Sequence, residues 1–267
     1  MKNRMERNRV KETIERGEVS FGFYVATPSP TIVELAGVAG MEWVRIDWAH
    51  SAVDLPMIEN MIRAAESYNM APFVRLNLDQ QKISSVLELG ALGIIVPDIE
   101  TADDARKIVN AAKFSPVGDR GMFSAPRKSG YGAVDGASFK KWTNEEVMVG
   151  IQIENVEAID QLEDILDVEG VDIVLSGRGD LANALGVPGQ RNHPDVLRAE
   201  EEIFHIARKK GKVISPQLDP TAADFQTKIM DWKGKGAQVI SFGHDLPIIK
   251  HALEQIVQRA ATAEEVH

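Results

Sequence analysis

Two carboxylates near the middle of the chain have the types and the spacing of a metal site. Glu154 follows the apolar run Val147–Ile153, and Asp180 follows the run Val171–Leu175 after a short polar turn. Near-continuous apolar runs of this length are typical of strands buried on both faces of a parallel sheet. The carboxyl ends of such strands lie side by side, and ligands bind there. Because two neighbouring acids repel unless a cation or a proton separates them, we predict that Glu154 and Asp180 bind a divalent metal ion.

Two further strand ends carry side chains suited to acid–base chemistry and to anion binding. Asp47 ends a predicted strand, and His50 follows three positions later, where it would act as a general base held in one tautomer. A loop histidine without a partner is the alternative. Arg75 lies near the end of the next strand, where its guanidinium needs an anion such as a substrate carboxylate. A salt bridge to an acid on a neighbouring strand is the alternative.

The turn after the second apolar run is suited to holding an anion. Ser176, Gly177 and Gly179 precede a predicted helix, so backbone N–H groups are exposed at its start, although Asp180 as a plain N-cap is the alternative. By the two-residue alternation of a strand, Gln152 points to the same side as Glu154. Its amide would donate to a ligand oxygen or only satisfy nearby backbone.

The elements that position these residues follow a repeated strand-then-helix order. Eight such units with no break in composition predict a single domain over residues 1–267, a (β/α)₈ TIM barrel, with an open doubly wound sheet as the rival. A short helix precedes the first strand, and the segment 114–146 is predicted to be a long loop because it has five glycines and little periodicity. The predicted strands are 20–25, 42–47, 72–76, 93–97, 147–153, 171–175, 212–215 and 238–242.

Composition excludes several classes of function. The formal net charge of −10 argues against a nucleic-acid-binding protein, and the absence of cysteine excludes disulfides, thiol catalysis and cysteine-ligated zinc. No apolar run is long enough to span a membrane and the first residues are charged, so we expect a cytoplasmic protein with no membrane partner. No lysine ends a predicted strand, which disfavours Schiff-base chemistry.

Seven segments at this spacing resemble the HpcH/HpaI aldolase family, the metal-dependent pyruvate aldolases of aromatic and sugar-acid breakdown. The resemblance runs from about Phe21 to Leu253. The segments are IDWAH (46–50), FVRL (73–76), GALGIIVP (90–97), SPVGDRG (115–121), QIEN (152–155), DVEGVDIVLSG (167–177) and DLANALG (180–186).

The resemblance implies a (β/α)₈ barrel that binds Mg²⁺ or Mn²⁺. It assigns the metal to Glu154 and Asp180, the catalytic base to His50, and a position near the reacting carbonyl to Arg75. Hard oxygen ligands from only two protein carboxylates favour Mg²⁺ or Mn²⁺, with Co²⁺ as a substitute.

The remaining implications concern the substrate and the assembly. Asp47 and Gln152 match supporting positions, and the backbone of Gly179 and Asp180 matches the site of the pyruvate carboxylate. Members of the family are typically homohexamers, trimers of dimers, in which neighbouring subunits exchange the last helix.

Three positions depart from the family pattern. Ala49 stands where the family has Glu, and Glu88 stands where it has an Asp that orients the histidine, so we carry Glu88 over to that catalytic role. Arg178 replaces a Pro in the turn before Asp180, where it would either select an acidic substrate or pair with a surface acid.

The sequence therefore predicts a class II aldolase. A 2-oxo acid such as pyruvate would chelate the metal, and the enzyme would form or cleave a C–C bond to an aldehyde through a metal-stabilised enolate. The alternatives are a metal-dependent 2-oxo acid decarboxylase or acyl-CoA lyase, and a catalytically silent barrel that acts as a binding protein.

Overall fold

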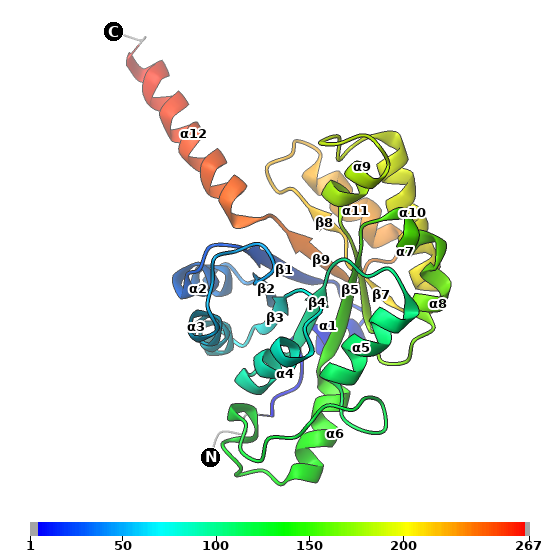
Figure 1. Cartoon of the computed structure of the whole chain (residues 1–267). Helices are drawn as coiled ribbons and strands as arrows, with labels where there is room; N and C mark the ends of the chain where they lie inside the picture. The colour runs from blue at the N-terminus through cyan, green and yellow to red at the C-terminus, as the bar shows by residue number, and fades with distance from the viewer. Residues whose placement is uncertain (1–4, 265–267) are drawn as a thin grey trace.

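A computed structural model describes residues 5–264 of the chain, in which nine parallel strands form one curled sheet (Figure 1). The order across the sheet is β7-β6-β5-β4-β3-β2-β1-β9-β8. The prediction of a parallel α/β fold is thus confirmed. The strands are β1 (Ser20–Val25), β2 (Trp43–Asp47), β3 (Ala71–Arg75), β4 (Gly93–Val96), β5 (Met148–Ile153), β6 (Ile173–Ser176), β7 (Val213–Ile214), β8 (Gln217–Leu218) and β9 (Val239–Phe242).

Strands β7 and β8 stand at opposite ends of this order but follow one another in the sequence. Strand β7 pairs with β6 and strand β8 pairs with β9, yet only Ser215 and Pro216 separate them. The Ser215 N–H donates to the carbonyl of Val174 (2.9 Å), and the Ser241 N–H donates to the carbonyl of Pro216 (3.0 Å). Proline has no N–H to give to a ladder, which accounts for the break in this strand. The stretch 213–218 therefore joins both edges of the curled sheet.

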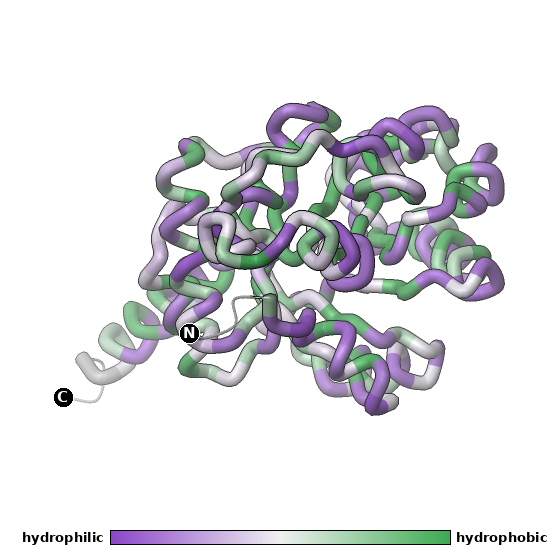
Figure 2. The backbone as a smooth tube through the Cα atoms, turned by 90° about the horizontal axis from the view of Figure 1, so that it is seen from below, coloured by the Kyte–Doolittle hydropathy of each residue, from purple (hydrophilic) through white to green (hydrophobic). Residues whose placement is uncertain are grey.

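Helices cover the outside of the sheet, and the largest apolar core lies between the two layers. Viewed from below, the helical segments change between hydrophilic and hydrophobic colours along their length, as amphipathic helices do (Figure 2). The helices of this layer are α2 (Pro30–Val38), α3 (Leu55–Ser67), α4 (Gln80–Leu89), α5 (Ala102–Ala112), α7 (Val156–Asp160), α8 (Leu162–Leu166), α9 (Arg178–Ala184), α10 (Pro194–Lys209) and α11 (Phe225–Gly234).

The segment 114–146 differs from its prediction as a loop. It contains a 3₁₀ turn, η1 (Arg127–Ser129), and helix α6 (Gly136–Glu146), whose first turn is capped by the Asp135 carboxylate accepting from the Ser138 N–H at 3.0 Å. The glycines that suggested a loop lie before α6 or at its first position, where a helix tolerates them.

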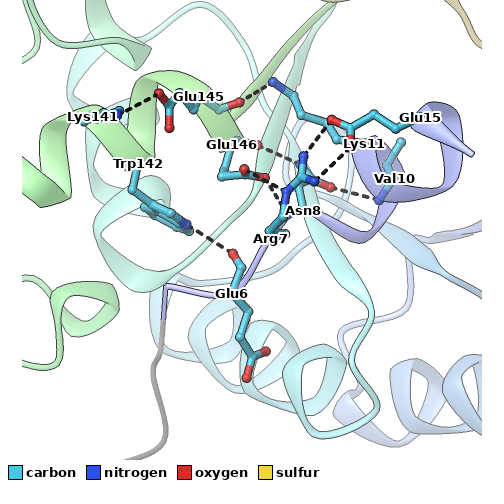
Figure 3. Close-up of polar contacts among 10 residues, drawn as sticks. All are labelled: Glu6, Arg7, Asn8, Val10, Lys11, Glu15, Lys141, Trp142, Glu145 and Glu146. Atoms are coloured by element: carbon cyan, nitrogen blue, oxygen red, sulfur yellow. Dashed lines mark hydrogen bonds and ion pairs between the residues drawn. The ribbon is translucent and has the colours of Figure 1, made fainter.

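The amino-terminal end of the sheet is closed by helix α1 (Arg9–Glu15) and α6 (Figure 3). The Asn8 side chain donates to the carbonyls of Leu92 (3.0 Å) and Glu146 (2.8 Å), and the Glu146 carboxylate accepts from the Asn8 N–H at 2.7 Å. Val10 is fully buried against the inner face of the sheet. In parallel sheets of this kind, ligands bind at the opposite end, where the strands have their carboxyl ends.

The inner face of the sheet has an apolar lower half, towards the amino ends of the strands, and a polar upper half, towards their carboxyl ends. Bulky side chains fill the lower half, and Gly22 gives them room, since a Cβ there would lie 2.1 Å from the Trp43 ring. The lower half comprises Trp43, Phe73, Ile95, Met148, Ile173, Leu175 and Val239. One step further along the strands, towards their carboxyl ends, the inward positions become polar, and the candidate site is built there.

The last helix, α12 (Asp245–Glu264), projects away from the body of the molecule (Figure 1). It is longer than the 247–259 that the sequence pattern predicts, and five of its apolar side chains are exposed: Leu246, Ile249, Leu253, Ile256 and Val257. Within residues 5–264, no helix combines the length and the apolar character needed to cross a bilayer.

Candidate active site

Strands β2 and β3 bring Asp47 and Arg75 together as register partners at their carboxyl ends. Both side chains are buried, and Arg75 Nη1 lies 3.6 Å from Asp47 Oδ1. Tyr24 joins them, since its hydroxyl donates to Asp47 Oδ2 (2.8 Å) and accepts from Arg75 Nη1 (3.0 Å). The guanidinium therefore pairs with an acid on the neighbouring strand, while Arg75 Nε is buried without a hydrogen-bond partner among residues 5–264.

His50 lies on the exposed turn after β2, and two different contacts position it. The Asp47 carboxylate accepts from the N–H of Ala49 (3.0 Å) and of His50 (3.4 Å), so it holds the backbone and not the ring, contrary to our expectation. The ring contact comes from Arg75, whose Nη2 lies 3.2 Å from His50 Nε2. Because a guanidinium only donates, Nε2 is the acceptor in this contact.

Three residues that were not predicted as site residues join this group: Arg45, Gln217 and His244. Arg45 Nη2 donates to Gln217 Oε1, and the Arg45 guanidinium stacks 3.8 Å from the centre of the Tyr24 ring. Burial lowers the pKa of Arg45 to about 10. His244, two residues after β9, packs edge-on against the Tyr24 ring, with the ring centres 4.8 Å apart. The signal for Arg45 was available, because Trp43, Arg45 and Asp47 alternate onto one face of β2.

Glu154 lies across the site, directly after β5, and is 3% exposed. Its carboxylate accepts from the Gln152 amide and from the backbone N–H of Asp98 at 3.0 Å. Asp98 adopts a positive φ of 55°, which turns the chain after β4 so that this N–H faces Glu154. Burial, followed by hydrogen bonding with the Asp98 carboxyl, raises the pKa of Glu154 to about 7. Among residues 5–264, no lysine, arginine or histidine forms an ion pair with Glu154.

The turn that carries Asp180 packs directly on Glu154. A Cβ at Gly177 would lie 2.2 Å from Glu154 Oε2, so only glycine allows this approach. Helix α9 begins at Arg178 and its N-cap is Gly177, so Asp180 is the third residue of the helix and not its cap. Asp180 is exposed, and the Arg191 guanidinium lies over Gly179, 3.7 Å from where a Cβ would be. The structure therefore brings Glu154 next to the turn that carries Asp180.

Comparison with known proteins identifies the group to which this chain belongs. The family model "HpcH/HpaI aldolase/citrate lyase" matches residues 20–252. The chain belongs to the HpcH/HpaI aldolase/citrate lyase family. A 2-keto-3-deoxy-L-rhamnonate aldolase of Escherichia coli O17:K52:H18 is 30% identical over 255 residues, covering 95% of this chain and 93% of the relative.

Two solved structures share the fold over nearly the whole chain. An HpcH/HpaI aldolase from Desulfitobacterium hafniense DCB-2 superposes with a TM-score of 0.87 at 26% identity, covering 96% of this chain and 97% of the other. Citrate synthase SbnG superposes with a TM-score of 0.86 at 27% identity, covering 96% and 98%. The predicted family and the prediction of an aldolase-type carbon–carbon lyase are confirmed.

The structure explains one departure from the HpcH/HpaI pattern. Arg178 pairs with Glu200 on α10, at 2.9 Å from Nε to each carboxylate oxygen and 2.5 Å from Nη2. An acid therefore neutralises the charge of Arg178, in line with the predicted alternative that Arg178 pairs with an acid of the protein. That acid is 2% exposed and is not at the surface.

A second departure from the HpcH/HpaI pattern lies away from the other predicted site residues. Glu88 is in the last turn of α4, the end of that helix that leads into the start of β4. There it is close enough to Arg120 to influence the pKa of that guanidinium. Within the described chain, the structure does not bring Glu88 to His50.

Proposed function

We propose that this chain is a class II aldolase that cleaves a 4-hydroxy-2-oxo acid into pyruvate, or a close 2-oxo acid, and an aldehyde, and also catalyses the reverse reaction. One observation carries the proposal: Glu154 is a buried carboxylate with no ion pair to a basic residue within residues 5–264, beside a turn with a second carboxylate, in a site that also holds His50 in contact with Arg75. The proposed cofactor is Mg²⁺ or Mn²⁺, with Co²⁺ as a substitute.

The residues present fit such a cation. Burying an unpaired carboxylate is costly, and Glu154 relieves that cost at neutral pH by binding either a proton or a cation. Residues 5–264 contain no cluster of three or more acids, histidines or cysteines arranged for a metal, so Glu154 and Asp180 would leave coordination positions for substrate and water, as Mg²⁺ sites usually do. When bound there, the ion supplies positive charge beside the oxygen atoms of the 2-oxo acid.

The Asp47 side of the site supplies the proton transfer. In the cleavage direction, His50 Nε2 takes the proton of the 4-hydroxyl group as the C–C bond breaks, and it returns a proton in the synthetic direction. Arg75 would exchange its contact with His50 for the substrate carbonyl, and its unpartnered Nε offers a further donor. Tyr24 and Asp47 hold Arg75 in place through the hydrogen bonds described above.

The α9 turn would bind the carboxylate of the 2-oxo acid. The backbone of Gly179 and Asp180 provides N–H groups at the start of the helix, with Ser176 and Gly177 shaping the turn. Within residues 5–264, Arg191 lies on this turn without a hydrogen bond or an ion pair, and adds a positive charge beside it. Gln152 would orient Glu154 through its amide.

The proposed substrate is a 2-keto-3-deoxy sugar acid, so that the aldehyde product is a small hydroxyaldehyde. This proposal rests on the E. coli relative named for 2-keto-3-deoxy-L-rhamnonate. Condensation of a 2-oxo acid with an acyl thioester is a second candidate, favoured by the likeness to citrate synthase SbnG. We expect product from pyruvate and an aldehyde, and none from oxaloacetate and acetyl-CoA.

We further propose that the sheet is a closed (β/α)₈ barrel in which 213–218 forms the seventh strand, and that α12 is exchanged between subunits of a homohexamer located in the cytoplasm. The hydrogen bonds of Ser215 and Pro216 to both neighbouring strands support closure. The exposed apolar side chains of α12 support an exchange, since a soluble monomer would leave them in water.

Two measurements on the metal-free protein test the proposal. We expect added Mn²⁺ to bind at one site per chain and to start deuterium exchange at the methyl group of pyruvate, followed by NMR in D₂O without any aldehyde. Glu154→Gln should lose both Mn²⁺ binding and exchange, whereas Glu157→Gln, an exposed acid on α7, should keep both. Exchange that persists in Glu154→Gln would contradict the proposal.

A further inference from the structure

A buried ion pair anchors the turn between β6 and α9 from its outer side. Glu200, on helix α10, accepts from the Ser176 hydroxyl and from the Arg178 guanidinium through both carboxylate oxygens. Glu200 is 2% exposed and the Arg178 side chain is 19% exposed, so little water competes for these contacts. Charge-assisted bonds of this kind are short and directional, and a buried pair holds its geometry because breaking it leaves an uncompensated charge.

The two groups that Glu200 holds lie on either side of Gly177. Ser176 ends β6, Arg178 begins α9, and the backbone of Gly177 between them packs against the Glu154 carboxylate. Asp180 follows two residues after Arg178 in the same helical turn. Within residues 5–264, Ser176, Arg178 and Glu200 form no hydrogen bond or ion pair with Glu154 or Asp180, so they act on the two acids only through this turn.

We propose that Ser176, Arg178 and Glu200 are positioning residues that set the spacing between Glu154 and Asp180 and thereby the affinity of the site for its cation. Arg178 does not select an acidic substrate, because Glu200 neutralises its charge. This inference rests on the proposed function, since it requires that the two acids bind a cation. It adds that helix α10, which lies outside the catalytic end of the sheet, determines how tightly Glu154 and Asp180 bind the cation.

The test is a double-mutant cycle on Mn²⁺ affinity, measured from the EPR signal of free Mn²⁺ with no substrate present. Arg178→Met and Glu200→Gln should each raise the dissociation constant roughly 10- to 100-fold, as is typical when groups that orient metal ligands are removed. Because the pair acts as a unit, the double variant should bind no more weakly than the weaker single variant. Arg178→Lys, which keeps the charge, should recover part of the affinity.

Arg198→Met is the matched control, because Arg198 forms an exposed ion pair with Asp195 on the same helix. Its Mn²⁺ affinity should equal that of the natural chain. Ser176→Ala provides a milder variant if the charge variants do not fold, and it should weaken binding by a smaller factor.

The outcomes separate this inference from the proposed function. If the natural chain itself fails to bind Mn²⁺, the proposed cation site is wrong. If the natural chain binds but the pair variants bind within about twofold of it, even with a lower melting temperature, the pair is only structural and the inference is wrong. Losses that add in the double variant would also overturn it, because two independent contacts would then be acting.

Discussion

Asp47 and Glu154 are both buried carboxylates at the carboxyl ends of strands, but their surroundings differ. Asp47 is 2% exposed and has the Arg75 guanidinium, the Tyr24 hydroxyl and two backbone N–H groups around it. Glu154 is 3% exposed and has one amide, one N–H and a neighbouring acid. Within residues 5–264, the first carboxylate forms an ion pair with a basic side chain and the second does not.

This difference indicates which acid serves the fold and which serves a ligand. A neutralised carboxylate such as Asp47 contributes to positioning its partners, here Arg75 and the turn that bears His50. A buried carboxylate without a cation is unfavourable in the ligand-free protein, and such groups concentrate at functional sites. Removing the charge of Asp47 should therefore lower the stability of the fold, because Arg75 loses its acid. Removing the charge of Glu154 should instead relieve the cost of burying an unpaired carboxylate.

Removing the cation should have the largest effect on activity, and it changes only the Glu154 side of the site. We expect EDTA to reduce aldol cleavage by roughly 10³-fold or more, since a Lewis-acid ion supplies several kcal/mol of transition-state stabilisation. Added Mg²⁺ or Mn²⁺ should restore the rate, measured by coupling pyruvate release to lactate dehydrogenase. A rate that survives complete chelation would show that Glu154 serves some other purpose.

Removing the base tests the Asp47 side. His50→Ala should lower kcat by about 10²–10⁴-fold, the usual contribution of a general base, while Mn²⁺ binding stays unchanged. The measurement is steady-state cleavage of a 2-keto-3-deoxy sugar acid. His205→Ala, an exposed histidine on α10, is the control and should keep the full rate. A near-normal kcat for His50→Ala would exclude it as the base.

Asp47→Asn tests whether Asp47, unlike Glu154, stabilises the fold through its charge. The substitution leaves the buried Arg75 without its acid, so the free energy of unfolding should fall by about 3 kcal/mol. Urea unfolding at neutral pH measures this loss. Asp103→Asn breaks an exposed pair with Lys107 and should cost less than about 1 kcal/mol. Equal losses for the two variants would contradict a structural role for Asp47.

The pH dependence of stability should give the smallest effect, specific to Glu154. Its pKa is 4.5 in the unfolded chain and about 7 in the folded one, so between these values the folded state holds a proton that the unfolded state has released. The free energy of unfolding of the metal-free protein should therefore decrease as the pH rises through this range, by at most about 1.4 kcal/mol per pH unit.

Urea unfolding of metal-free Glu154→Gln should lack this contribution, and the difference between its pH profile and that of the natural chain isolates Glu154. Glu157→Gln should keep the natural profile. Parallel profiles for the natural chain and Glu154→Gln would mean that Glu154 is ionised without cost.

Most strands were predictable because they are short apolar runs, and those that form the site end at or next to a polar residue. Parallel strands covered on both faces leave this pattern in any sequence, and it located Asp47, Arg75 and Glu154 near their ends. Helix α6 was missed because its sequence begins at a glycine in a glycine-rich segment, and glycine at a helix start carries a different meaning from glycine in its interior.

The partners of the site residues were not predictable in the same way. Tyr24 and Arg45 are register partners on β1 and β2, but Gln217 lies on β8, and the curl of the sheet brings it to Arg45. Glu200 lies in the middle of an amphipathic helix, where the pattern gives no sign that its carboxylate reaches back to Arg178.

The sequence by itself determined the order of strands and helices, the end of the sheet that carries the chemistry, and the family, because these depend on residue types and their spacing along the chain. Only the tertiary structure decided which acids are neutralised, since neutralisation depends on distances between residues far apart in the sequence. Asp47 has Arg75, Glu200 has Arg178, and Glu154 has no such partner within residues 5–264. A charge buried away from water is stabilised only by what lies within a few ångströms of it, and folding alone sets those distances.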